Sequence, residues 1–366
     1  MLKYAYIQHW SQLSIISNCD YGGIGLIKFE DQILHDDIDI DFIKYDKLSG
    51  AHLFLTAIAL ETIISQNNSA FLNRAYKIVE QQLEHELQST IDIYFKHSPN
   101  KHLAIRILDP EILLKGTRYF NTTNAISTIL ESHLSIRKED LKLIFRDIEQ
   151  DRENLRGLEF ALRWPRITRI QLRCVQRATK RFRNSAGRTC LLIPCVKDYQ
   201  QFMDFCCSYM VEINKMNNFK SAPIEIGVNI EFPFGAEIRN YTNISWFLFG
   251  LNDFIPEVLN RNRFEDWGSD EVLRVNIHPS VLDSIVDILD EMAKTFQMNE
   301  SMLVGFGGQP VNCLESINVL DSISAKYPFN FYRLVYEECL YKHDQRQINF
   351  KSGGSDNRKY NLPHSH

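Results

Sequence analysis

The sequence predicts an α/β protein that folds as a (β/α)8 TIM barrel. Eight short apolar runs can be counted along the chain, and helical patterns fill most of the gaps between them. Alternation of strand and helix favours a parallel sheet, and eight such units favour a closed barrel. The eight predicted strands are residues 3–7, 24–29, 103–108, 190–196, 226–232, 246–251, 302–306 and 329–335.

The length of the chain allows one large barrel with added segments. We expect its 366 residues to divide into a barrel over 1–344 and a tail over 345–366. The tail is polar, contains the run SGGSDN and is expected to be disordered. Two stretches with helical patterns, 31–98 and 111–150, are predicted to be insertions in the barrel.

The overall composition argues against several classes of partner. The net charge of −5 gives no general attraction to nucleic acid. No apolar run approaches the roughly 18 residues of a membrane helix, and the N-terminus lacks a signal-peptide core. The eight cysteines never form C-x-x-C, and several lie in apolar runs. Buried free thiols explain them better than disulfides or zinc, so we expect a cytoplasmic protein. From the charge and the short apolar runs, we expect neither nucleic-acid nor membrane partners.

Two neighbouring predicted strands end in polar residues. In WFLFGLNDF, the apolar run stops at Gly250 and is followed by Asn252 and Asp253, and IEIGVNIEFP delivers Glu231 in the same way. Barrel enzymes keep their chemistry at the carboxyl ends of the strands, and Mg²⁺ prefers carboxylate oxygens. Taken singly, each acid has a simpler explanation, a helix cap for Glu231 and an Asx-turn for Asp253. The pair on successive strands favours a shared metal ion.

Basic residues recur through the predicted helix over 166–183. Spacings of three and four residues place several of them on one helix face. They stand at positions 166, 169, 173, 177, 180, 181 and 183. Such a stripe is usually a solvated face, and we prefer that interpretation to an anion-binding role.

The order of several short motifs resembles a known family. GIGLIKFE, LAIRILD, LLIPCV, VNIEFP, FGLNDF, VNIHPSVL and FGGQP follow one another along the chain. In this order they resemble the C-terminal barrel of the phosphoenolpyruvate (PEP)-utilising enzymes, which include pyruvate phosphate dikinase, PEP synthase and enzyme I of the sugar phosphotransferase system. The resemblance runs from about residue 4 to residue 335. Each motif alone is weak, and their joint order and spacing carry the argument.

The resemblance implies roles for individual residues. Glu231 and Asp253 would be the ligands of Mg²⁺, with Mn²⁺ as an alternative ion, and Asn252 would contact the substrate phosphate. Arg106 would bind phosphate or carboxylate, for which a planar fork is suited. Arg263, ten residues after Asp253, falls where the family carries a further phosphate-binding arginine.

The chain departs from the family at other positions. Lys28 stands for the arginine of the family's GIGLxRTE, which keeps the charge and loses the fork. The family's catalytic cysteine aligns with Phe306, and a phenyl ring cannot transfer a proton. The arginine of the family's L-G-x-R-G/A falls on Glu159 if one gap is introduced, which would replace a cation by an anion in a phosphate site. Arg156 and Arg163 are possible substitutes nearby. The catalytic residue is therefore left unassigned.

These observations lead to three functional hypotheses. The first is a divergent Mg²⁺-dependent PEP/pyruvate phosphotransferase, kinase-like in its chemistry. The family's mobile domain with a phosphorylatable histidine has no counterpart among the contexts of the eleven histidines, so a separate phosphohistidine or nucleotide-binding protein would be its partner. The second is a non-catalytic PEP-binding or scaffolding module, and the third a Mg²⁺-dependent C–C lyase. A homodimer is left open.

Overall fold

The computed structural model describes most of the barrel and a set of helices beside it. The described residues are 1–7, 13, 21–28, 30, 50–66, 69–97, 101–109, 146, 156–182, 187–209, 212, 224–261, 277–296 and 301–335. The predicted insertion 111–150, apart from residue 146, and the predicted tail 345–366 lie outside them, as does Arg263.

Eight parallel strands close into a barrel in the order of the sequence, which confirms the predicted fold class. Each strand pairs with the next, and β8 returns to pair with β1. The strands are β1 (Leu2–Ile7), β2 (Gly23–Ile27), β3 (His102–Arg106), β4 (Thr189–Ile193), β5 (Ile224–Ile230), β6 (Trp246–Gly250), β7 (Leu303–Gly307) and β8 (Asn330–Val335).

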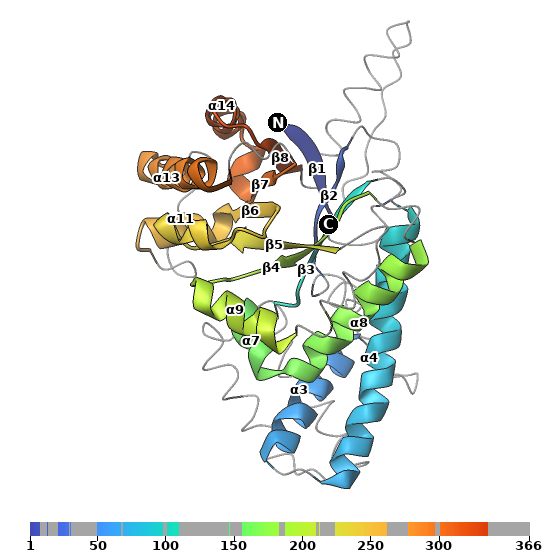
Figure 1. Cartoon of the computed structure of the whole chain (residues 1–366). Helices are drawn as coiled ribbons and strands as arrows, with labels where there is room; N and C mark the ends of the chain where they lie inside the picture. The colour runs from blue at the N-terminus through green and yellow to red at the C-terminus, as the bar shows by residue number, and fades with distance from the viewer. Residues whose placement is uncertain are drawn as a thin grey trace, which may run out of the picture.

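The described helices lie outside the strands (Figure 1). They are α3 (Gly50–Gln66), α4 (Ala70–His97), α7 (Gly157–Arg163), α8 (Pro165–Phe182), α9 (Tyr199–Ser208), α11 (Leu251–Val258), α13 (Pro279–Phe296) and α14 (Leu314–Ser324), with short 3₁₀ turns at Gly235–Asn240 and Gln309–Asn312. In the part of the chain that the structure describes, no helix is long and apolar enough to cross a membrane.

Side chains of the described strands fill the interior of the barrel and form a packed core. Successive strand residues point alternately inward and outward, and the outward set joins the helices in the main hydrophobic core. Toward the N-terminal ends of the strands, the Tyr4 ring stacks on Tyr332 with 4.4 Å between centroids. Trp246 Nε1 donates a hydrogen bond to the same Tyr332 hydroxyl at 2.6 Å. A ligand is therefore expected at the opposite, C-terminal mouth, where barrel sites lie.

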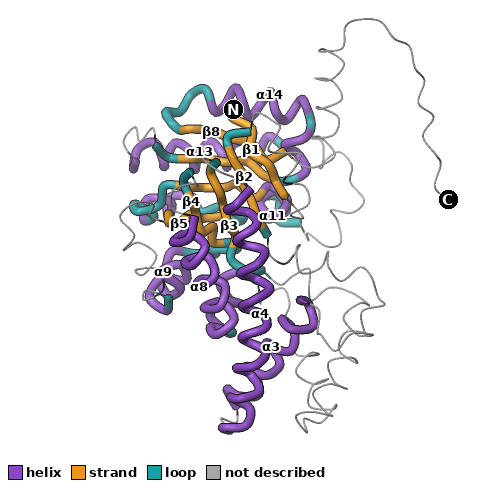
Figure 2. Tube along the Cα trace, turned by 90° about the vertical axis from the view of Figure 1, so that its right-hand side faces the viewer, coloured by secondary structure: helices purple, strands orange, loops and turns teal. Residues whose placement is uncertain are grey.

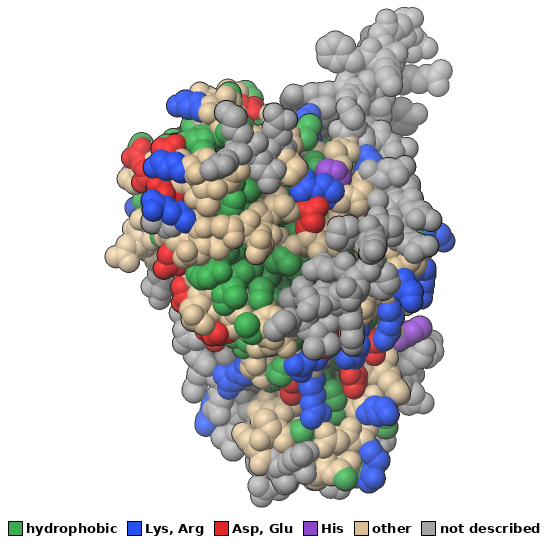
Figure 3. All heavy atoms as spheres, viewed as in Figure 1, with side chains coloured by type: hydrophobic (Ala, Val, Ile, Leu, Met, Phe, Trp, Pro, Cys, Tyr) green, Lys and Arg blue, Asp and Glu red, His purple; other side chains and the backbone are tan. Residues whose placement is uncertain are grey.

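Helices α3, α4 and α8 pack together and extend away from the barrel (Figures 1 and 2). The basic stripe of α8 faces acidic residues of α4: Arg173 Nη2 lies 2.7 Å from Glu80 Oε1, and Arg177 and Arg181 pair with Glu84 and Asp92. Figure 3 shows basic and acidic side chains side by side over this part of the molecule. The interpretation as a solvated face agrees with the exposed fractions of Arg177 and Arg181, which are 49% and 56%, and the structure adds that these arginines pair with acidic residues of α4.

Candidate functional site

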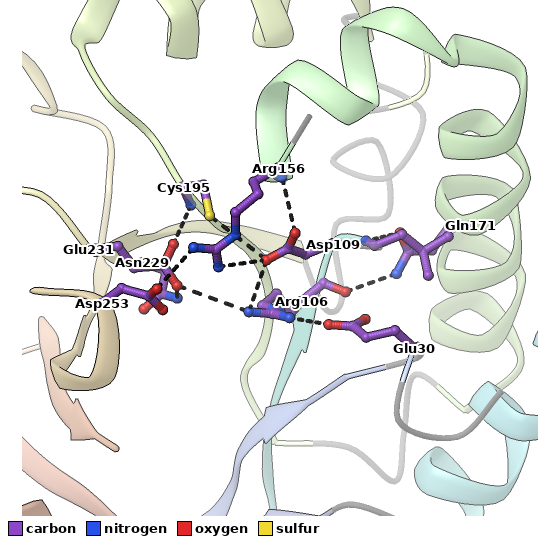
Figure 4. Close-up of polar contacts among 11 residues, drawn as sticks. Glu30, Arg106, Asp109, Arg156, Gln171, Cys195, Asn229, Glu231 and Asp253 are labelled. Atoms are coloured by element: carbon purple, nitrogen blue, oxygen red, sulfur yellow. Dashed lines mark hydrogen bonds and ion pairs between the residues drawn. The ribbon is translucent and has the colours of Figure 1, made fainter. Parts of the chain in front are cut away.

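Charged side chains from several elements meet at the C-terminal mouth of the barrel (Figure 4). All but one come from the end of a strand or from the few residues after it, because the carboxyl ends of parallel strands open at the same face. The exception is Arg156, which directly precedes α7. The cluster, called the mouth network below, consists of Glu30, Arg106, Asp109, Arg156, Cys195, Asn229, Glu231 and Asp253.

Arg106 is the inner guanidinium of the mouth network. Its Nη2 donates to Glu30, while Nη1 lies 3.6 Å from Asp109 Oδ2 and 4.0 Å from Glu231 Oε1. Burial works to lower the pKa of Arg106, but these three carboxylates outweigh it and raise the pKa well above its usual value. Gln171 of α8 fixes the strand end, since its Nε2 donates to the Arg106 carbonyl at 2.9 Å. Arg106 thus lies at the mouth with three carboxylates around it, and its role in binding an anion stays a prediction.

Arg156 is the second guanidinium and stands just before α7. Its Nη1 donates to Asp253 Oδ1 at 2.9 Å, and its Nη2 donates to Asp109 Oδ2 at 3.1 Å. The following Gly157 has a φ of +47°, and a Cβ there would lie 2.5 Å from the Pro194 carbonyl oxygen, so only glycine fits. Arg156 was one of the two substitutes named for the family's arginine.

Glu159 lies elsewhere, so the expectation that an anion replaces a cation in the phosphate site is corrected. Its Oε1 accepts a hydrogen bond from Gln201 Nε2 at 2.7 Å. Gln201 belongs to α9, outside the mouth network. The reason is helical geometry, because Glu159 is in the first turn of α7 while Arg156 precedes the helix and reaches inward.

Glu231 is held in one orientation by two hydrogen bonds, and its charged form is disfavoured. Its Oε2 accepts from the Cys195 backbone N at 2.8 Å, and its Oε1 accepts from Asn229 Nδ2 at 2.5 Å. Burial, followed by the nearby charge of Asp253, raises the pKa of Glu231. Burial also acts to raise the pKa of Asp109, but Arg156 and Arg106 outweigh it and lower that pKa. The two guanidiniums therefore stabilise the charged form of Asp109 more than that of Glu231.

The donors at the mouth suit a hard cation. Glu231 and Asp253 lie at the same mouth, where four carboxylates surround two guanidiniums. The amide oxygen of Asn229 is buried without a hydrogen-bond partner among the described residues. Carboxylate and amide oxygens are donors that fit Mg²⁺ or Mn²⁺. Nevertheless, the described residues contain no group of three or more His, Cys, Asp or Glu side chains already arranged around a metal position.

Asn252 and Lys28 lie at the rim of the mouth. Asn252 Oδ1 accepts from the Gln309 backbone N at 2.9 Å and so ties α11 to the turn after β7. In that turn Gly308 has a φ of +119°, and a Cβ would lie 2.9 Å from Asn252 Oδ1. Lys28 follows β2, with Nζ 5.3 Å from the centroid of the Tyr6 ring. Among the described residues, neither side chain is hydrogen bonded to the mouth network.

Phe306 faces outward, away from the barrel interior. Its ring stacks on Phe249 and Phe331 with centroid distances of 5.3 and 6.0 Å. The neighbouring Gly305 and Gly307 hold the inward positions, where an added Cβ would meet Tyr332 or Leu334. The end of β7 thus presents no proton-transferring group to the mouth.

Cys195 is a mouth residue that the sequence analysis did not identify. Its φ of +51° is rare for a residue with a side chain, and its Sγ lies 3.8 Å from Asp109 Oδ2. Burial raises the pKa of the thiol well above its usual value, so it stays neutral. Glu30, Asp109 and Asn229 were also overlooked, although each is a letter of a quoted motif that stands at or just beyond a strand end.

Comparison with known proteins agrees with this geometry. No curated protein matches the sequence. The family model described as "PEP-utilising enzyme, PEP-binding domain" matches residues 7–325 of the 366. This match spans every strand from β2 to β7 and the whole mouth network. The chain therefore belongs to the PEP-utilising enzyme family and contains its PEP/pyruvate-binding barrel.

Proposed function

We propose that the mouth binds a small PEP- or pyruvate-like anion together with one Mg²⁺ or Mn²⁺ held by Glu231 and Asp253. The observation that carries the proposal is that the carboxylates of Glu231 and Asp253 lie at one mouth beside the guanidiniums of Arg106 and Arg156. A divalent cation held by the two carboxylates would offset the repulsion between them, and the guanidiniums would stabilise the anion.

The rim supplies further donors for the anion. Asn252 Oδ1 is occupied by the Gln309 N–H, which leaves its Nδ2 to donate to a ligand oxygen. Lys28 has no carboxylate partner among the described residues and only the Tyr6 ring beside it, so its charge supports anion binding. When bound, the cation would polarise a ligand oxygen and stabilise an enolate. Arg263 is proposed as another phosphate ligand from the family resemblance alone.

For turnover, we propose phosphotransferase-type chemistry with a separate phosphohistidine or nucleotide-binding partner. A specific observation favours a second candidate, a non-catalytic PEP-binding module. The end of β7 carries outward Phe306 and inward Gly307, neither of which can move a proton. A module of this kind would bind the same ligands without converting them.

Calorimetric titration of the full chain tests the binding proposal. Wild type should bind Mn²⁺, and oxalate or PEP once Mn²⁺ is present. Asp253→Ala should abolish the Mn²⁺ signal while circular dichroism shows an unchanged fold, since one of two carboxylate ligands is lost. Asp321→Ala is a matched control, because that carboxylate pairs with the N-terminal amine at 2.9 Å, away from the mouth. Unchanged Mn²⁺ binding in Asp253→Ala would sink the metal assignment.

A further inference from the structure

At the C-terminal mouth, the chain of β3 continues past the end of its neighbour β2. Strand β2 ends at Ile27, which pairs with Ile105, and β3 runs on beyond that pair. Successive residues of a strand turn their backbone N–H and C=O groups to opposite edges. Since Ile107 N donates to a carbonyl of β4 at 3.0 Å, the backbone groups of Arg106 and Leu108 face the edge that β2 has left.

One buried side chain takes the place of the missing strand (Figure 4). Gln171 of α8 is fully buried, and its amide meets both backbone groups. Its Nε2 donates to the Arg106 carbonyl and its Oε1 accepts from Leu108 N, each at 2.9 Å. A side-chain amide offers a donor and an acceptor, as a peptide group does. Gln171 therefore continues the pairing of β3 where β2 stops.

The backbone that Gln171 holds carries two side chains of the mouth network. Arg106 is one of the two bonded residues, and Asp109 directly follows the other. Arg106 Nη1 lies 3.6 Å from Asp109 Oδ2, so the two side chains also meet each other. The proposed cation ligands, Glu231 and Asp253, follow β5 and β6 instead. The amide of Gln171 thus bears on the proposed anion-binding arginine and not on the strands of the cation ligands.

We propose that Gln171 is a positioning residue that sets the affinity of the mouth for the anion without setting that for the cation. The inference rests on the proposed function, in which Arg106 stabilises the anion. Without the amide, a carbonyl and an N–H would be left unpaired in the core, which is unfavourable. The end of β3 would shift toward other partners and carry the Arg106 guanidinium with it, and ligand sites tolerate displacements of only about 0.5 Å.

The helix that presents Gln171 is itself anchored. Arg173, two residues further along α8, lies 2.7 Å through Nη2 from Glu80 Oε1 and 3.3 Å through Nε from Glu84 Oε1, both on α4. Gln88 of α4 adds a hydrogen bond from Nε2 to the Cys174 carbonyl of α8 at 3.3 Å. A side chain on an anchored helix positions its partner more precisely than one on a loop.

The test is calorimetric titration of the full chain with Mn²⁺ alone, and with oxalate in saturating Mn²⁺. Gln171→Leu removes both hydrogen bonds with little change in side-chain size. Oxalate should bind this variant about tenfold more weakly than wild type, while the Mn²⁺ constant stays within about twofold. Gln88→Leu is the matched control, because it makes the same chemical change and removes a bond to α8 rather than to β3. It should change neither constant.

Gln171→Glu distinguishes positioning from general damage to the fold. A protonated carboxyl can still donate to the Arg106 carbonyl and accept from Leu108 N, whereas an ionised one cannot donate. Burial raises the pKa of a carboxyl. The oxalate affinity of this variant, divided by that of wild type at each pH, should therefore fall as pH rises from about 5.5 to 8. A ratio as low as that of Gln171→Leu at every pH would overturn positioning by these hydrogen bonds.

Unchanged oxalate binding in Gln171→Leu, or equal weakening of both ligands, would overturn the positioning role alone, provided that wild type binds both. Wild type that binds neither ligand would overturn the proposed function and this inference together. If the variants do not fold, hydrogen exchange of wild type decides the question. Oxalate added in saturating Mn²⁺ should slow amide exchange at the end of β3 and in α8 around Gln171, and unchanged exchange in α8 contradicts the inference.

Discussion

Both ends of the barrel pair arginines with carboxylates, but the ratio of arginines to carboxylates differs between them. At the N-terminal end, Arg188 and Glu225 form two parallel hydrogen bonds of 2.6 Å, and Ser245 donates to the same carboxylate. One guanidinium meets one carboxylate, which is the strong bidentate geometry. At the mouth, two guanidiniums are spread over four carboxylates, with Arg156 donating a single bond to each of two partners.

The same difference appears in the pKa values of one carboxylate at each end. Burial acts to raise the pKa of Glu225, but hydrogen bonds from Arg188 and Ser245 outweigh it and lower that pKa. The pKa of Glu231 is raised instead, because burial and Asp253 outweigh its arginines. The charged form of Glu225 is therefore favoured by its partners, whereas that of Glu231 is disfavoured, as expected for a carboxylate that we propose binds a cation.

The largest expected effect comes from the inner arginine of the mouth. Arg106→Met should lower the free energy of unfolding by about 3–5 kcal/mol, because it leaves buried carboxylates without their cation. Urea unfolding followed by circular dichroism measures this loss. In folded protein with Mn²⁺ present, oxalate binding should also weaken by about 1.5–3 kcal/mol. A fully stable Arg106→Met would show that the mouth carboxylates are neutralised in another way.

Glu61 of α3 shows the effect of burial on a carboxylate outside the mouth network. Glu61 Oε1 accepts from the Arg166 backbone N at 2.9 Å and Oε2 accepts from the Tyr76 hydroxyl at 3.4 Å. Burial raises its pKa from 4.5 to about 7, so the folded state keeps the proton to higher pH than the unfolded chain does. The contribution of Glu61 to stability is then fully present below pH 4.5 and is lost as pH rises through 7, by up to about 3 kcal/mol.

Glu61→Gln removes this titration and keeps an acceptor oxygen for the Arg166 N–H. Its unfolding free energy should therefore fall less than that of wild type between pH 4.5 and pH 8, as measured by urea unfolding at several pH values. Oxalate binding should be unchanged, since Glu61 is remote from the mouth network. Parallel pH profiles for the two proteins would contradict the raised pKa.

At the N-terminal end, Arg188→Met should act on stability alone. Losing a partly buried bidentate pair should cost about 1–3 kcal/mol of unfolding free energy. Binding of Mn²⁺ and oxalate should keep wild-type constants, because the packed aromatic interior separates this end from the mouth. A change in either binding constant would break the proposed division between the two ends.

The sequence predicted the barrel and the place of its site better than the partners within the site. Strand periodicity and order sufficed for eight strands, and strand-end position sufficed to single out Glu231 and Asp253. Arg106 was singled out by the family resemblance. The position of Arg156 at the mouth could not be predicted from the sequence. It depends on the positive φ of the following Gly157 and on the residue at which α7 begins. The acidic partners of the basic stripe could not be predicted for a similar reason, since they lie on α4, some ninety residues away in the sequence.

The orientation of Phe306 leads to the smallest expected effect. We predict that the isolated chain does not make pyruvate from PEP at a rate resembling that of the family, and that Phe306→Cys does not restore turnover. A general acid must lie within hydrogen-bond reach of the atom it protonates, and the side chain at 306 points into the outer core between Phe249 and Phe331. The new thiol would be buried there, on the far side of the strand from the mouth.

A coupled pyruvate assay with Mg²⁺ checks this prediction, with and without a histidine-bearing domain from a relative. Gly307→Cys is the matched comparison, because position 307 faces inward and its Cβ would lie 2.7 Å from Leu334 Cδ1. That variant needs Leu334 to shift, so its fold must be verified first. Robust turnover by unassisted wild type would falsify the prediction and direct attention to another proton donor at the mouth. Turnover gained by Phe306→Cys alone would mean that β7 rotates its outward face toward the ligand, in conflict with the packing of Phe306 against two aromatic rings.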